Sequence, residues 1–271
     1  MELNFNITEN PSYLQVYEFE KYDHEGVRLW LKKNWSFIVY TSVVYVSLIK
    51  IGQKWMAERK PYELKKQLVV WNGFLTILSF AVFIRMLPEL IVECAREGFY
   101  SSLCHFENHN VATSFWGVLF CFSKVLDFGD TLFLVLAKKP VIFLHWYHHV
   151  TVAVYCLYVA DSSDPSSRWF AVMNSFVHTI MYAYYGLKAM NLKISRKISM
   201  LITSVQISQM IFGMYINFLT YFTKVKGVAC DRPYWNIEVA LMMYASYFML
   251  FAHFFYRVYV SRSQQQKLKR I

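Results

Sequence analysis

Charged residues are scarce in this chain of 271 residues, at 17% against about 25% in an ordinary soluble domain. Glycine and proline are also few, with 9 and 6 residues, which excludes a collagen-like chain. The 5 cysteines are too sparse for a disulfide-rich miniprotein. Apolar residues are abundant instead: 56% of the chain is hydrophobic, 19% is aromatic, and the mean hydropathy is +0.27. This composition excludes a disordered protein and favours a membrane domain.

Seven apolar stretches each approach the roughly 20 residues that a helix needs to cross a bilayer. We therefore predict an all-α, polytopic membrane protein with seven transmembrane helices. They lie at about residues 35–51, 68–92, 114–136, 141–160, 169–190, 198–222 and 235–259. The first 34 residues contain no apolar stretch, so no secretory signal peptide is expected. The expected organisation is a lumenal segment (1–34), a seven-helix catalytic domain (35–259) and a basic cytosolic tail (260–271).

The net charge of +10 is carried in short runs between the apolar stretches, which is typical of membrane topology and not of nucleic-acid binding. Lys and Arg are more frequent on the side of the C-terminus, so we expect a cytosolic C-terminus and a lumenal N-terminus. The sequence ends with Lys267 and Lys269 at the fifth and third positions from its last residue. This pattern resembles the dilysine retrieval signal of endoplasmic-reticulum membrane proteins; the alternative is a basic tail that serves topology alone.

Two features of the predicted lumenal side agree with this orientation. Asn6 begins the glycosylation sequon Asn6-Ile7-Thr8. Cys104 follows the second span and Cys230 follows the sixth, so both fall where disulfides persist. We expect a Cys104–Cys230 disulfide, with two unpaired thiols as the alternative.

Three histidines, His145, His148 and His149, open the predicted fourth span. Their spacing of three and four places them on one helical face. One buried histidine is usually a satisfied core residue, but three together inside a bilayer are costly and indicate function.

Further polar residues lie inside the neighbouring spans. Lys124, Asp127 and Asp130 share a face of the third span, with pairing to Lys124 as the structural alternative for the carboxylates. The fifth span carries Asn174, His178 and Tyr182, and the sixth carries Gln206 and Gln209. For the amides, hydrogen bonding between helices is the ordinary explanation. At 1.5 Å per residue, however, all these groups fall in one layer, from the cytosolic half to the midplane. We therefore predict one intramembrane polar chamber.

Histidine clusters suggest either a metal or acid–base and nucleophilic chemistry. A membrane desaturase or hydroxylase of the di-iron type uses around eight histidines, and this chain has eight. However, His24, His105 and His109 fall on the lumenal side, so only the four chamber histidines and His253 remain. Nothing supplies ligands for a second metal. A neutral imidazole, in contrast, can attack a thioester, and we expect no bound metal or cofactor. A receptor would not need three intramembrane histidines, and a transporter usually shows repeats, which are not seen here.

Four ordered motifs carry a family resemblance. They are Lys124-x-x-Asp127-x-x-Asp130-Thr131, Leu144-His145-x-x-His148-His149, Asn174-x-x-x-His178-x-x-Met181-Tyr182 and Thr203-x-x-Gln206-x-x-Gln209. Together they resemble the fatty-acid elongase family, the very-long-chain 3-oxoacyl-CoA synthases of the endoplasmic reticulum. One departure is Asp127, where the family usually has Glu. Trp146-Tyr147 resembles the branch that acts on saturated and monounsaturated chains.

The resemblance implies a condensation of long-chain acyl-CoA with malonyl-CoA to 3-oxoacyl-CoA, with release of CoA and carbon dioxide. We expect His148 to form an acyl-imidazole, His149 and His178 to polarise carbonyls, and Asp127 and Asp130 to orient histidines. Direct condensation with histidine as base is the rival. Candidate contacts for the CoA phosphates are Lys138, Lys139, Lys193, Arg196 and Lys197, with topology alone as the alternative. Membrane lipids and the ketoreductase, dehydratase and enoyl reductase of the elongation cycle are implied partners, and a homodimer stays open.

Overall fold

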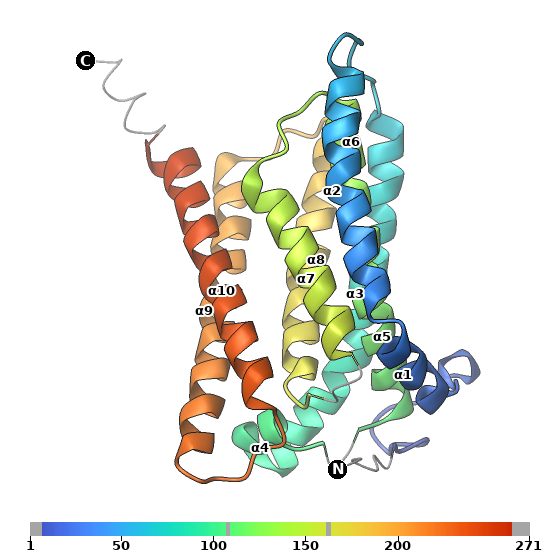
Figure 1. Ribbon diagram of the computed structural model, residues 1–271, viewed down its shortest axis with the longest axis vertical. Coiled ribbons are helices and arrows are strands. Elements are labelled where there is room, and N and C mark those ends of the chain that lie inside the picture. Colours follow the sequence, from blue (N-terminus) through green and yellow to red (C-terminus); the bar gives the residue numbers. More distant parts are fainter. Residues whose placement is uncertain (1–6, 107–108, 161–163, 262–271) are drawn as a thin grey trace.

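The computed structural model describes residues 7–106, 109–160 and 164–261, which form a bundle of helices along one long axis (Figure 1). No strand occurs within these ranges. The long helices are α2 (Ser36–Met56), α3 (Lys65–Arg96), α5 (Val111–Leu126), α6 (Gly129–Leu136), α7 (Phe143–Val159), α8 (Ser167–Ala189), α9 (Arg196–Val225) and α10 (Tyr234–Phe255). The prediction of an all-helical protein is therefore confirmed for the described residues.

In the described part of the chain, four segments are long and apolar enough to cross a membrane. They are α2, α3, α9, and Tyr234–Ser261, in which α10 continues into the π-helical turn η2 (Tyr256–Ser261). The remaining predicted spans are shorter or more polar. α7 has 17 residues, and α8 has 23 but carries Arg168, Asn174 and His178 among its buried side chains. These polar side chains lower the mean hydropathy of α8.

The predicted third span, 114–136, is not one continuous helix, and this prediction was wrong. It divides at Asp127–Phe128 into α5 and α6. The amides of Phe128, Asp130 and Thr131 each bond to a carbonyl three residues back, so the backbone is tightened into a short 3₁₀-like turn. Gly129 suits this turn because a Cβ there would collide with the Trp71 ring. The turn sends Asp130 and Thr131 to different neighbours.

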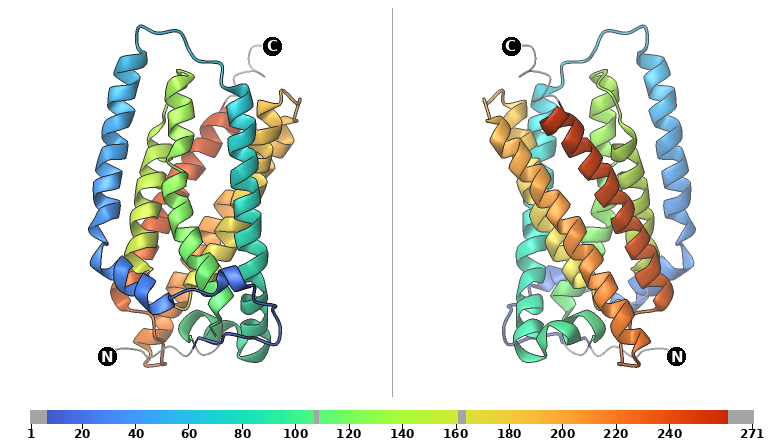
Figure 2. Two further views of the ribbon diagram at one scale, coloured as in Figure 1. Left: turned by 90° about the vertical axis from the view of Figure 1, so that its right-hand side faces the viewer. Right: turned by 90° about the vertical axis from the view of Figure 1, so that its left-hand side faces the viewer.

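The end of the bundle opposite η2 is cross-linked by polar contacts and small helices: η1 (Glu18–Glu20), α1 (His24–Lys33) and α4 (Gly98–Cys104) (Figures 1 and 2). Arg85 of α3 binds the Glu20 carboxylate at 2.7 Å. Burial alone would raise the pKa of Glu20, but hydrogen bonds from Arg85, the Tyr17 amide and Trp116 lower it below its ordinary value. Glu89 binds Arg168 at 3.0 Å and His109 at 2.9 Å.

A second buried network at this end joins the connection before α8 to the start of α10. Arg232 pairs with Asp164 at 3.0 Å and donates to Thr220 and Asn217 of α9. Beside it, Cys104 and Cys230 form the expected disulfide across 126 residues. The predicted glycosylation site at Asn6 and the tail residues Lys267 and Lys269 lie outside the described residues.

Loss of the disulfide should destabilise this end of the bundle. A disulfide that closes so long a loop restricts the unfolded chain. Removing a native disulfide lowers the free energy of unfolding by about 2–5 kcal/mol. We expect Cys104→Ser with Cys230→Ser to lower the midpoint of thermal unfolding in detergent by several degrees. The control is Cys94→Ser, which removes a half-buried free thiol. Equal midpoints for the double variant and the control would contradict the prediction.

Candidate active site

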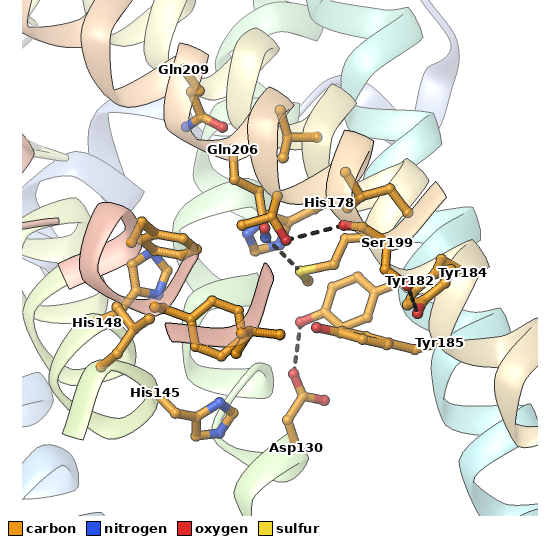
Figure 3. Close-up of a pocket in the computed structure, with 18 of the residues that line it drawn as sticks. Asp130, His145, His148, His178, Tyr182, Tyr184, Tyr185, Ser199, Gln206 and Gln209 are labelled. Carbon is orange, nitrogen blue, oxygen red and sulfur yellow. Dashed lines mark hydrogen bonds between the residues drawn. The ribbon is translucent and has the colours of Figure 1, made fainter. Parts of the chain in front are cut away.

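A cavity of about 680 Å³ opens in the half of the bundle that lies away from the disulfide. Its walls come from the first turns of α7, the second half of α8, the first half of α9 and the end of α10, with Asp130 from α6. Because successive helices alternate in direction, these four parts meet at the same end of the bundle. The cavity is lined by the predicted site residues His145, His148, His149, His178, Asp130, Asn174, Tyr182, Gln206, Gln209 and Arg196 (Figure 3). We call it the chamber.

The three histidines of α7 lie on one wall of the chamber, as their spacing predicts. The ring centroids of His145 and His149 are 4.4 Å apart, and those of His148 and His149 are 5.7 Å apart. His149 is 7% exposed, and its Nδ1 atom is buried without a hydrogen-bond partner among the described residues. Since this nitrogen is enclosed, the part of His149 that lines the chamber is the rest of its ring.

His148 is held by rings instead of hydrogen bonds. Its imidazole packs on Tyr247 at 4.9 Å between centroids and on Phe251 at 6.3 Å. No hydrogen bond restrains its side chain within the described part of the chain, and the residue lines the chamber. Tyr247 is fixed in turn by a hydrogen bond of 2.6 Å between its hydroxyl and that of Thr151. Neither ring nitrogen of His148 is therefore committed to a partner among the described residues.

The carboxylates form a cluster with Lys124 behind the chamber wall. The Lys124 ammonium donates to the Asn174 side-chain oxygen at 2.8 Å and to Asp127 at 3.4 Å. The Tyr182 hydroxyl lies 3.0 Å from Asp127 and 2.9 Å from Asp130. Lys124 and Asp127 are 2% and 3% exposed, so neither contacts the open space directly. The cluster fixes Tyr182 and Asn174, which do line the chamber.

The expectation that the two aspartates orient the histidines finds little support. Asp127 lies 3.9 Å from Nδ1 of His178, which is a charge contact and not a hydrogen bond. Asp130 accepts from the Trp71 indole at 2.7 Å and faces Tyr182. The hydroxyl of Thr131 instead reaches Nε2 of His145 at 2.9 Å, and it also bonds the Tyr45 hydroxyl at 2.6 Å.

Beyond Arg196, the wall formed by α9 is polar but neutral. The Gln206 amide donates to the Met181 sulfur at 3.3 Å, and the Thr203 hydroxyl lies 3.4 Å from that of Tyr259. Tyr184 of α8 and Ser199 of α9 share a hydrogen bond nearer the mouth (Figure 3). These groups can bind uncharged oxygens of a substrate.

Two cations lie at the mouth of the chamber: Arg196, as predicted, and Lys188, which the sequence analysis missed. Arg196 is exposed and donates to the carbonyls of Val258 and Tyr259. Lys138, in contrast, caps the carbonyls of Ala57 and Arg59 and does not line the chamber. Lys139, Lys193 and Lys197 are exposed outside the lining.

The structure also shows which histidines lie outside the chamber. His253 is exposed on α10 and does not line the chamber, although Phe251 and Phe254 do. Within the ranges that the structure describes, no group of three or more His, Cys, Asp or Glu side chains is arranged to hold a metal ion. The geometry thus gives no support to the desaturase or hydroxylase alternative.

The fold and the chamber define a helical membrane protein with a histidine-lined reaction site. Residues 30–267 match the ELO family, described as the GNS1/SUR4 family, and the chain belongs to this family. It is 40% identical over 265 residues to "Very long chain fatty acid elongase 6" of Drosophila melanogaster, covering 96% of this chain and 84% of the relative. It is 40% identical over 264 residues to "Putative fatty acid elongase 3" of Caenorhabditis elegans, covering 94% and 82%. The human "Very long chain fatty acid elongase 6" is 37% identical over 254 residues, covering 93% and 96%.

Proposed function

We propose that this protein elongates fatty acids by condensing a long-chain acyl-CoA with malonyl-CoA to a 3-oxoacyl-CoA. The observation that carries the proposal is the chamber, in which His148 presents two unrestrained nitrogens beside His149, His145 and His178. Family membership and the names of the relatives agree with this chemistry. The direct test is the mass of the product formed from palmitoyl-CoA and malonyl-CoA by the purified protein.

The first half-reaction transfers the acyl group to the protein. A ring nitrogen of neutral His148 forms a bond to the thioester carbon, the carbon–sulfur bond breaks, and the imidazole proton leaves with the CoA thiolate as CoA thiol. The developing oxyanion needs donors, and the side-chain amides of Gln206 and Gln209 line the chamber and can supply them. The product is an acyl-imidazole, which remains a reactive acyl donor.

The second half-reaction consumes malonyl-CoA. Its carbon–carboxylate bond breaks, carbon dioxide leaves, and the resulting carbanion attacks the acyl carbon while the carbon–nitrogen bond to His148 breaks. A proton returns to the imidazole, so His148 is regenerated. Asn174 and the two glutamines offer hydrogen-bond donors for the malonyl thioester oxygen. Direct condensation, with histidine acting only as base, is the rival that leaves no acyl adduct.

The proposal also includes the membrane orientation and the cellular location of the protein. We propose that α2, α3, α5 with α6, α7, α8, α9 and α10 are the seven spans and that the chamber opens to the cytosol. The Lys and Arg distribution supports this orientation, and the disulfide lies at the opposite, lumenal end. The tail residues Lys267 and Lys269 support retention in the endoplasmic reticulum. Acyl-CoA, malonyl-CoA, membrane lipids and the other enzymes of the elongation cycle are the proposed partners.

Arg196 should bind the CoA phosphates at the chamber mouth. A charge-assisted hydrogen bond contributes about 1.5–3 kcal/mol, so we expect Arg196→Gln to raise the KM for acyl-CoA about 10-fold with a smaller change in kcat. The matched control is Lys197→Gln, which removes a neighbouring charge outside the lining. Equal increases of KM in the two variants would show a general effect of surface charge and contradict a phosphate contact at Arg196.

A further inference from the structure

A chain of hydrogen bonds enters the chamber from α2, a helix that does not line it. The Tyr45 hydroxyl lies 2.6 Å from the Thr131 hydroxyl, and that hydroxyl lies 2.9 Å from Nε2 of His145. Tyr45 is 7% exposed and Thr131 is 1% exposed, so water does not compete at either group. The Tyr45 ring is stacked on Phe128 with centroids 4.1 Å apart, which fixes the direction of its hydroxyl.

The direction of each hydrogen bond between Tyr45, Thr131 and His145 can be assigned by counting the available donors. A phenol carries one proton, and within the described residues the only partner of the Tyr45 hydroxyl is Thr131. If Tyr45 donates to Thr131, the Thr131 proton is directed to Nε2 of His145, which must then offer its lone pair. In the reverse direction, the phenol proton of Tyr45 would be buried without an acceptor, which costs about 1–3 kcal/mol. The same cost opposes a protonated His145. Its Nε2–H group would have to donate to Thr131, and the hydroxyl proton of either Thr131 or Tyr45 would then have no acceptor.

We propose that Tyr45 and Thr131 hold His145 as the neutral tautomer with its proton on Nδ1. Nε2 is then closed by Thr131, so His145 does not receive the acyl group. Nδ1 has no partner among the described residues, and His145 lines the chamber, so this N–H group serves as a fixed donor to a substrate carbonyl or carboxylate. The substrate part of this inference rests on the proposed function; the tautomer does not.

The break between α5 and α6 allows two adjacent residues, Asp130 and Thr131, to contact different parts of the site. Asp130 faces Tyr182 and Trp71, whereas the next residue, Thr131, faces Tyr45 and His145. Tyr45 and Thr131 are positioning residues, because they act through His145 and touch no substrate. Their role is similar to that of the hydrogen-bond partners that orient metal-binding histidines. Mutation of such partners typically lowers metal affinity or activity about 10- to 100-fold.

The test combines steady-state kinetics with a direct measurement of the tautomer. The variants are Tyr45→Phe, which keeps the ring on Phe128, Thr131→Val, which keeps the side-chain shape, and Thr131→Ser, which keeps the hydroxyl. The control is Tyr40→Phe on the same helix, where the side chain is 70% exposed. We expect Tyr45→Phe and Thr131→Val to lower kcat about 10-fold with KM for both substrates unchanged within about twofold. Thr131→Ser should restore most of kcat, and Tyr40→Phe should match the parent protein.

Solid-state NMR of protein labelled with ¹³C and ¹⁵N histidine reports the tautomer, and His145→Gln assigns the signal. The parent protein should show an Nδ1–H tautomer at His145, and Thr131→Val, which removes the donor to Nε2, should convert it to a mixture. An Nε2–H tautomer in the parent protein, or a parent-like kcat in Tyr45→Phe, would overturn the inference. A parent protein that makes no 3-oxoacyl-CoA would overturn the proposed function, while the NMR measurement would still decide the tautomer.

Discussion

Replacement of His148 by alanine should abolish 3-oxoacyl-CoA formation, with a loss of at least about 10³-fold in kcat. The side chain supplies the nucleophile of the proposed first half-reaction, whereas Nε2 of His145 is bonded to Thr131 and Nδ1 of His149 is buried. Incubation of the parent protein with palmitoyl-CoA alone should add one palmitoyl group, which intact-mass spectrometry detects. The adduct should be missing from the alanine variant.

The matched control is His253→Ala, which removes an exposed histidine of the same bundle end that does not line the chamber. It should retain parent-like activity and the adduct. A parent protein that forms product without any adduct would favour the direct condensation. Full activity of His148→Ala would contradict a catalytic role for this residue in either mechanism.

Replacement of Lys124 by methionine should both destabilise the protein and inactivate it. Lys124 is the cation of the buried cluster that holds Asp127, and Asp130 lies on the other side of Tyr182. Removing one partner of a buried ion pair costs about 3–5 kcal/mol, because the remaining charge loses its compensation. We expect a clear fall in the thermal unfolding midpoint in detergent and a loss of activity of more than about 100-fold, since Tyr182 and Asn174 lose their fixed positions.

The double variant Lys124→Met with Asp127→Asn separates the two effects. Both charges are then absent, so most of the stability should return. Activity should stay low, because the contacts that position Asn174 and His178 are still missing. Lys226→Met, at an exposed position beyond α9, is the control for the loss of one positive charge. A double variant as unstable as Lys124→Met would show that packing of the lysine stem, and not charge compensation, stabilises this region.

The sequence predicted the chamber well because each motif obeys helical spacing within one element. Residues three or four apart on α7 share a face whatever surrounds that helix, and alternation of helix direction then brings the four polar segments to one end. The disulfide was predictable for a similar reason, since both cysteines fall in connections on the same side.

Other features depend on contacts between elements and left no signal in the sequence. Tyr45 is one of 20 tyrosines and lies on an otherwise unremarkable apolar helix, so nothing marks it as a partner of Thr131. The break at Asp127–Phe128 falls inside a long, mainly apolar stretch that the sequence alone gives no reason to divide. The Trp71 ring of α3 leaves no room for a side chain at position 129, and this contact cannot be seen in the sequence. A lysine near the end of a helix gives the same sequence pattern whether it caps carbonyls, as Lys138 does, or reaches a cavity, as Lys188 does.

The uneven distribution of cross-links has a mechanical consequence. The α9–α10 hairpin is anchored at one end by the disulfide and by Arg232, while at the other end Arg196 ties η2 to α9 itself. Separation of this hairpin from α7 and α8 at the chamber end would leave all of these contacts intact. It would break neutral hydrogen bonds such as Tyr184–Ser199 and Tyr147–Ser246. We infer that the cross-linked end is the pivot for any opening of the bundle, and that opening would widen the end where the proposed thioester substrate enters and leaves.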